Sequence, residues 1–134
     1  MDDQALKQKW IAALRSGEYP QTRRTLHNGD GYCCLGVLCE VAGLERQKIS
    51  AGRYGYVDTD GLEIRYAELP PTFAKQNALR SQGTLLSSKQ ISRSLGEERA
   101  HALSSRGGGE ESIVWLNDSG ATFGEIAQLI EDYL

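Results

Sequence analysis

The chain has 134 residues, of which 40% are hydrophobic and 25% charged, with a formal net charge of -3 and a pI near 5.4. This length and composition are typical of one globular domain with a single core. No apolar run is long enough to span a bilayer, and the acidic balance argues against nonspecific binding to duplex nucleic acid.

The amino-terminal segment predicts an amphipathic helix over Asp3–Ser16. Leu6, Trp10 and Leu14 recur at helical spacing, and Gly17 follows as a stop signal. The opening residues, MDDQALKQ, are acidic and polar, so they resemble neither a secretory signal nor a mitochondrial presequence. We therefore expect a cytoplasmic protein.

A basic segment rich in turn signals follows, over residues 18–31. Pro20 and the pairs Asn-Gly and Asp-Gly predict irregular structure, and Arg23, Arg24 and His27 form its polar cluster. Arginine grips phosphate in a bidentate fork, so this cluster is a candidate site for an anionic partner. The plainer interpretation is a solvated basic loop.

The run from Tyr32 to Ala42 carries only one charged residue, Glu40, and predicts a central buried helix. Gly36 lowers its helix propensity, which indicates that a second helix crosses closely there.

The three cysteines, Cys33, Cys34 and Cys39, all lie in this run. Their spacing is not that of a metal site, and their angular positions on a helix splay them apart. An odd number in a cytoplasmic chain indicates reduced thiols, which behave as small hydrophobes when buried. Pairing of Cys33 or Cys34 with His27 in catalysis is the minor alternative.

Residues 54–66 predict a β-hairpin. Tyr54, Tyr56, Leu62, Ile64 and Tyr66 are its strand residues, and the sequence Asp-Thr-Asp-Gly at 58–61 is its turn. The two aspartates lack the glutamate that completes a calcium-binding loop, so they are interpreted as turn residues.

Three short helices are predicted next. The first begins at Pro70 or Pro71, the second spans Ser88–Leu95 with Ser88 as its cap, and the third spans Glu97–Leu103. The sequence SSRGGGEES, over 104–112, predicts a mobile loop.

The carboxyl-terminal region predicts an apolar strand or turn over 112–120, followed by a helix that Thr122 and Glu125 cap. The apolar face of this helix is expected to pack against the cysteine helix. Asn117 and Asp118 stand at the corner between the two elements, where such side chains bind either backbone groups or a ligand.

The last quarter of the chain is acidic. From residue 107 to residue 134 it has six acids and no lysine or arginine. Glu125, Glu131 and Asp132 on the final helix form either a solvated face or a surface that mimics charge for a partner.

Together these features predict a single α+β domain over residues 1–134, with a buried central helix, a β-hairpin and flanking amphipathic helices. They predict no catalytic constellation, no metal site and no cofactor.

Four segments, KWIAALRSGEYPQ, YCCLGVLCEVAG, LPP and WLNDSGATFGEIAQLIE, resemble a family of small accessory proteins encoded by tailed bacteriophages and prophages. The most specific parts are the block Cys-Cys-Leu-Gly-Val-Leu-Cys and the block Leu-Asn-Asp-x-Gly. The stretch from about Arg80 to Glu111 lies outside the resemblance and is expected to be an insertion or a mobile segment.

The resemblance implies a phage accessory protein that acts by binding, in counter-defence, and blocks a host defence protein. The alternative is a sponge that sequesters a nucleotide-type signal, with Arg23, Arg24, Asn117 and Asp118 lining a site between the subunits of a homo-oligomer. The further alternative is a small hydrolase that uses the Cys/His pair described above.

Overall fold

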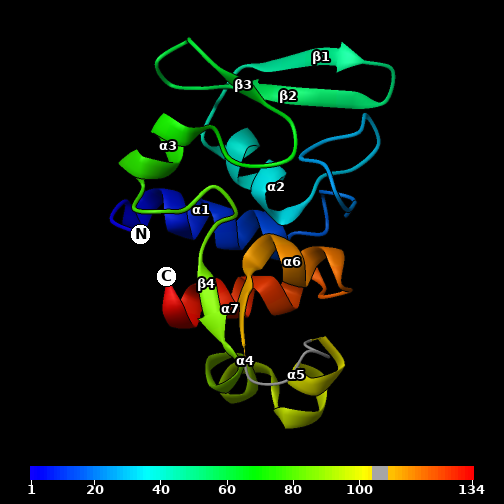
Figure 1. Ribbon diagram of the computed structural model, residues 1–134, viewed down its shortest axis with the longest axis vertical. Coiled ribbons are helices and arrows are strands. Elements are labelled where there is room, and N and C mark those ends of the chain that lie inside the picture. Colours follow the sequence, from blue (N-terminus) through cyan, green and yellow to red (C-terminus); the bar gives the residue numbers. More distant parts are fainter. Residues whose placement is uncertain (104–108) are drawn as a thin grey trace.

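A computed structural model describes residues 1–103 and 109–134 (Figure 1). Its helices are α1 (Gln4–Arg15), α2 (Cys34–Val41), α3 (Pro71–Gln76), α4 (Ser88–Leu95), α5 (Glu97–Leu103), α6 (Ile113–Asp118) and α7 (Phe123–Tyr133). Its strands are β1 (Arg46–Ser50), β2 (Arg53–Val57), β3 (Ile64–Arg65), β4 (Leu85–Ser87) and β5 (Glu110–Ser112). The predicted α+β class is confirmed. Within the described ranges, no helix is both long and apolar enough to cross a membrane.

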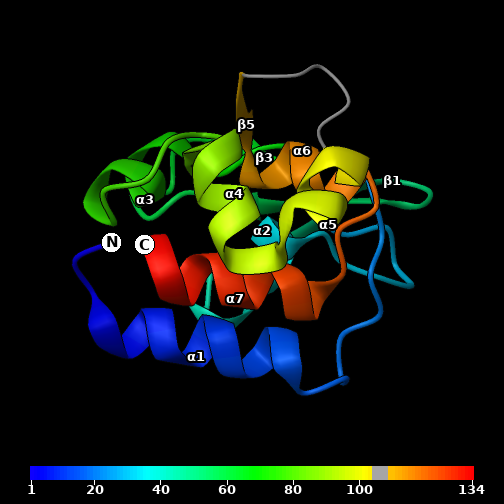
Figure 2. The ribbon, with the colours of Figure 1, turned by 90° about the horizontal axis from the view of Figure 1, so that it is seen from below.

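Helix α7 lies at the centre of the helical layers. Figure 2 shows it between α1 on one side and the α4–α5 pair on the other, and its main packing contacts are with α1, α4 and α6. The capping box of Thr122 and Glu125 that starts this helix is confirmed. The predicted partner, the cysteine helix, is not among these main packing partners of α7, although the buried residues of both helices belong to one core.

Helix α2 is the predicted buried helix, and every residue from Cys34 to Cys39 is buried. Trp10 of α1 donates its indole N–H to the Cys34 carbonyl oxygen at 2.9 Å. The close neighbour of Gly36 is loop backbone and not the crossing helix that was predicted. A Cβ atom there would overlap the carbonyl oxygen of Leu26, in the loop before α2. The missing side chain therefore makes room for loop backbone.

The predicted hairpin over 54–66 is present as β2 and β3, which pair antiparallel around the turn at 58–63. Leu62 and Tyr66 lie outside the strands. Strand β1 was not predicted. It pairs antiparallel with β2 through a tight turn at Ala51 and Gly52 and completes a sheet in the order β1-β2-β3.

Asp58, a predicted turn residue, caps helix α3 from outside that helix. Its carboxylate accepts hydrogen bonds at 2.8 Å from the N–H groups of Thr59, Thr72 and Phe73. Burial raises the pKa of this carboxyl, but the three backbone hydrogen bonds outweigh burial and lower the pKa below its usual value. The charged form of Asp58 therefore stabilises the junction between the hairpin and α3.

We expect Asp58→Ala to lower the free energy of unfolding by about 2 kcal/mol at pH 7, because two helix N–H groups lose their acceptor. The folded-state pKa is lowered, so this stabilisation is present above the unfolded pKa of about 4 and is lost as pH falls through the folded value. Urea unfolding of both proteins at pH 7 and pH 3 measures the difference. A difference that is equally large at both pH values would contradict this role.

The segment between Arg80 and Glu111 was predicted as an insertion or a mobile segment, but much of it packs against the core. Strand β4 pairs antiparallel with β5, and Leu86, Ile91 and Leu103 are buried. Helix α5 has the predicted bounds, whereas the cap of α4 is Ser87 and not Ser88. Of the loop predicted over 104–112, residues 104–108 lie outside the described residues and 110–112 form β5.

The predicted strand or turn over 112–120 is wrong in its centre, where the structure has helix α6. Ser112 caps this helix by accepting a hydrogen bond from the Trp115 N–H at 3.1 Å. The helix places Asn117 and Asp118 in its last turn, beside the basic loop.

Candidate functional site

Asn117, a predicted site residue, lies inside the protein with an exposed fraction of 0%. Its Oδ1 accepts hydrogen bonds from Gln21 Nε2 at 2.9 Å and from the Cys34 N–H at 3.2 Å. Its Nδ2 donates to the Thr22 carbonyl oxygen at 2.9 Å and to Asp118 Oδ1 at 3.1 Å. This uses the full hydrogen-bonding capacity of an asparagine side chain. Asn117 therefore joins the basic loop, α2 and α6, and it does not face a ligand.

Asp118 fixes the backbone of the basic loop. Its Oδ1 accepts a hydrogen bond from the Arg24 N–H at 2.9 Å, and Arg24 has a φ of 66°, in the left-handed region. The side chains of Arg23 and Arg24 are exposed, and neither guanidinium has an ion-pair or hydrogen-bond partner among the described residues. Of the four residues expected to line a nucleotide site, Asn117 is enclosed and Asp118 binds the loop backbone, whereas the two arginine side chains are exposed.

His27 does not join the arginine pair, because it is buried and bound by other residues. Its exposed fraction is 5%. Its Nε2 lies 3.3 Å from Arg46 Nη1 and its Nδ1 lies 2.8 Å from the Gly31 carbonyl oxygen. Arginine only donates, so Nε2 accepts and Nδ1 carries the proton. Both ring nitrogens are occupied, which leaves His27 no free nitrogen for an anion or for a thiol.

Four side chains lie around the Arg46 guanidinium, namely His27, Tyr32, Glu40 and Tyr54. The His27 ring stacks on Tyr32 with centroids 4.1 Å apart, and Tyr19 packs edge-on against Tyr32 at 5.3 Å. Arg46 donates to the Tyr32 hydroxyl at 3.2 Å and lies 5.7 Å from the centre of the Tyr54 ring, a cation–π distance. We call Tyr19, Tyr32, Glu40, Arg46 and Tyr54 the aromatic–arginine patch.

Glu40 connects this patch to the core. Its Oε2 accepts a hydrogen bond from the Tyr56 hydroxyl at 2.7 Å and lies 3.9 Å from Arg46 Nη1. Burial, together with Glu40, raises the pKa of Tyr56, which stays a neutral donor. The Arg46 side chain keeps 41% of its surface exposed. The patch is thus a pre-ordered, solvent-accessible surface of aromatic and charged groups.

The three acidic residues predicted as a partner surface on α7 all have internal partners. Glu125 forms two hydrogen bonds with Arg99, at 2.7 and 3.0 Å, and these, more than its partial burial, set its pKa below the usual range. Glu131 pairs with Arg15 at 2.8 Å, and Asp132 accepts hydrogen bonds from Ser94 and Gln128. These carboxylates join α7 to α1, α4 and α5.

The cysteines are free thiols in the core. Burial raises the pKa of Cys33 to about 12 and the pKa values of Cys34 and Cys39 well above their usual range. A thiol in this state is a poor nucleophile. Among the described residues, no group of three or more His, Cys, Asp or Glu side chains is placed to hold a metal ion.

In the folded protein we expect the thiols to react with Ellman's reagent at least about 100-fold more slowly than a thiol in a short peptide. All three should react once guanidinium chloride unfolds the chain. The measurement is the absorbance time course in both conditions. One thiol that reacts rapidly in the folded protein would contradict the core assignment and favour the Cys/His hydrolase.

His27, which adjoins the aromatic–arginine patch, was predicted as a site residue, whereas none of the five patch residues was. The available signal was the tight turn at Ala51 and Gly52 between Arg-Gln-Lys-Ile-Ser and Arg-Tyr-Gly-Tyr-Val, which is typical of a hairpin. That hairpin would have placed Arg46 and Tyr54 on one face. Tyr19 and Tyr32 come from distant segments and left no such signal.

The comparisons with known proteins yield one family. The family described as domain of unknown function (DUF8296) matches residues 1–134, the whole chain. No curated protein and no solved structure matches the chain.

Proposed function

The chain belongs to the DUF8296 family, and we propose that it is a phage-encoded accessory protein that binds and blocks a host defence protein in the cytoplasm of the infected cell. The observation that carries the binding role is the aromatic–arginine patch. Tyrosine and arginine are the residue types enriched at the energetic centres of protein interfaces. The phage origin and the counter-defence role rest on the sequence resemblance.

The contacts that hold the side chains of the patch in place support a role in binding. Tyr32 is held between the His27 ring and Tyr19, and Arg46 is oriented by Tyr32 and by Glu40. Side chains that are ordered before association lose little conformational entropy when a partner arrives. The Gly31 carbonyl oxygen and Arg46 occupy the two nitrogens of His27, and the thiols are buried, so this part of the chain favours recognition over catalysis.

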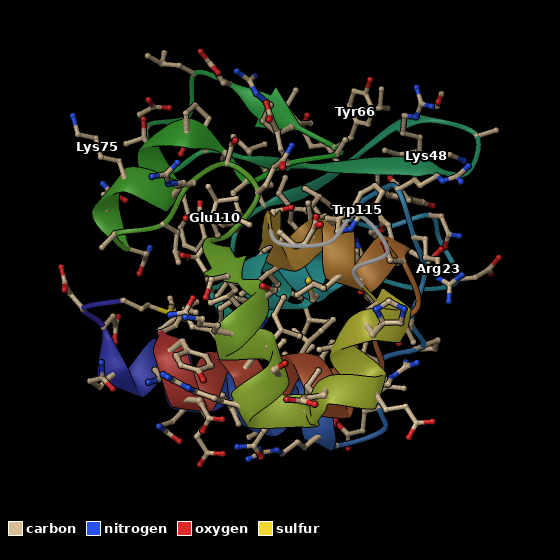
Figure 3. All side chains as sticks on the ribbon, turned by 60° about the horizontal axis from the view of Figure 1, so that its bottom comes forward. Arg23, Lys48, Tyr66, Lys75, Glu110 and Trp115 are labelled. Carbon is tan, nitrogen blue, oxygen red and sulfur yellow. The ribbon has the colours of Figure 1, made fainter. Side chains whose placement is uncertain are left out.

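We expect Arg46→Ala to weaken the complex with the host partner by about 30-fold, the effect of losing an interface residue of this type. The test is a pull-down from host lysate with tagged wild-type chain, followed by interferometry of the retained protein against each variant. Lys75→Ala is the matched control, because Lys75 is exposed on α3 and Figure 3 shows it on the opposite side from Arg23 and Lys48. Equal retention by wild type and Arg46→Ala would contradict the proposal.

The second candidate, a sponge for a nucleotide-type signal, is supported by the exposed guanidinium groups of Arg23 and Arg24, which lack partners among the described residues. Phosphate is the natural ligand of such a pair. Calorimetric titration with cyclic and ADP-ribose-type nucleotides tests it, with an Arg23→Ala, Arg24→Ala double variant as control. Absence of heat from the wild-type chain would remove this candidate.

A further inference from the structure

Strand β1 is an open edge of the three-stranded sheet. It is outermost in the order β1-β2-β3, and all five of its residues are exposed. Figure 1 shows β1 along the margin of the molecule, with β2 on its inner side. An edge of this kind presents main-chain donors and acceptors to any chain that can pair with it.

The register identifies which main-chain groups face outward. Val57 N–H donates to the Glu45 carbonyl oxygen at 2.9 Å, so Glu45 points toward β2. Main-chain groups alternate in direction along an antiparallel strand, so those of Arg46 and Lys48 point to the open side. Apart from pairing within the sheet, no hydrogen bond of the described residues reaches the main-chain atoms of Arg46 or Lys48.

The two faces of β1 differ in chemistry. Arg46 and Lys48 are two residues apart and therefore lie on the same face as Tyr54, beside the aromatic–arginine patch. Ile49 lies on the other face, where a Cβ placed on Gly55 would come 2.8 Å from Ile49 Cδ1 and 2.9 Å from Ile64 Cγ1. One face of the edge is thus cationic, and the other carries the uncharged side chains of Gln47 and Ile49.

We infer that an extended acidic segment of the partner protein pairs with the free edge of β1 as an added strand. Acidic side chains at alternate positions then lie opposite Arg46 and Lys48, and the residues between them lie on the Ile49 side. A second copy of the chain is a poor occupant, because pairing β1 with itself brings like charges together. This inference rests on the proposed function and defines the partner class for the same surface.

The test uses an eight-residue fluorescein-labelled peptide with Glu at alternate positions and Val or Thr between them. Fluorescence anisotropy compares it with a peptide in which Lys replaces Glu, and with a Glu peptide methylated on every internal amide nitrogen. N-methylation keeps the charges but removes the hydrogen bonds of an added strand. On the protein side, Lys48→Pro removes the outward N–H at an edge position that tolerates proline, and Lys48→Gln removes only the charge.

We expect the Glu peptide to bind at least about tenfold more tightly than the Lys peptide and the methylated peptide. Lys48→Pro should bind it at least about tenfold more weakly than Lys48→Gln does, with both variants folded by circular dichroism. Equal binding of the methylated peptide, equal binding by the two variants, or no binding of the Glu peptide would each overturn strand addition.

The two proposals can fail separately. If Arg46→Ala abolishes retention of the host partner and Lys48→Pro does not, the patch binds the partner and strand addition is wrong. If the Glu peptide binds through the edge but Arg46→Ala leaves host-partner retention unchanged, strand addition stands and the proposed function is wrong.

Discussion

Replacing Gly36 with alanine is expected to lower the free energy of unfolding by about 3 kcal/mol, at the upper end for overpacked cores. The added Cβ would overlap the Leu26 carbonyl oxygen and lie 2.8 Å from the Leu26 carbonyl carbon. Backbone cannot move aside as a flexible side chain can, and the same Leu26 oxygen accepts a hydrogen bond from the Cys33 N–H at 3.2 Å. The substitution therefore separates the basic loop from the start of α2.

Gly124→Ala is the matched control, since Gly124 is also a helical glycine. It is exposed in the first turn of α7, and its nearest neighbour is Thr122 Oγ1 at 3.8 Å from the added Cβ, an ordinary contact. There alanine should stabilise the protein by about 0.5–1 kcal/mol. Thermal unfolding would give a midpoint about 10 °C lower for Gly36→Ala and slightly higher for the control. Similar midpoints for the two variants would contradict the close approach of Leu26.

Asn117→Leu is expected to cost about 3 kcal/mol, although leucine is similar to asparagine in size. The change leaves Gln21 Nε2 with one acceptor fewer, and it leaves the Cys34 N–H and the Thr22 carbonyl oxygen without the partner that Asn117 supplies. Unsatisfied polar groups in a buried place each carry a desolvation cost.

Gln82→Leu is the control for this experiment, because Gln82 is exposed and the same kind of change there should stay within about 0.5 kcal/mol. Urea unfolding gives both free energies. Amide hydrogen exchange provides a second measurement, in which the N–H groups near Thr22 and Cys34 should lose protection in Asn117→Leu. A stability equal to that of the wild type would show that the hydrogen bonds of the Asn117 side chain contribute little.

The elements that were predictable carry their own end signals. Asp3 caps α1, and Thr122 with Glu125 caps α7, so both helices begin where local sequence places them. The turn of the β2–β3 hairpin and the proline at the start of α3 are equally local. The cysteine helix was predictable because an uninterrupted apolar run has to be buried.

The errors fall where distant parts of the chain decide the structure. The apolar run from Ile113 to Leu116 is too short to distinguish strand from helix by periodicity. Three of the partners of Asn117 lie 83 to 96 residues away in the sequence, so nothing local indicated that this side chain is enclosed. The aromatic–arginine patch likewise combines Tyr19, Tyr32 and Arg46 through tertiary packing alone.

The central position of α7 has a consequence for biosynthesis. This helix follows all the other described elements along the chain, yet α1, α4 and α6 each pack against it. During translation the apolar stripe of α1, with Ile11 and Leu14, emerges early and remains without its α7 partner until α7 leaves the ribosome. The nascent protein therefore completes this part of its core only after α7 has been synthesised, and until then the apolar stripe of α1 lacks its α7 partner.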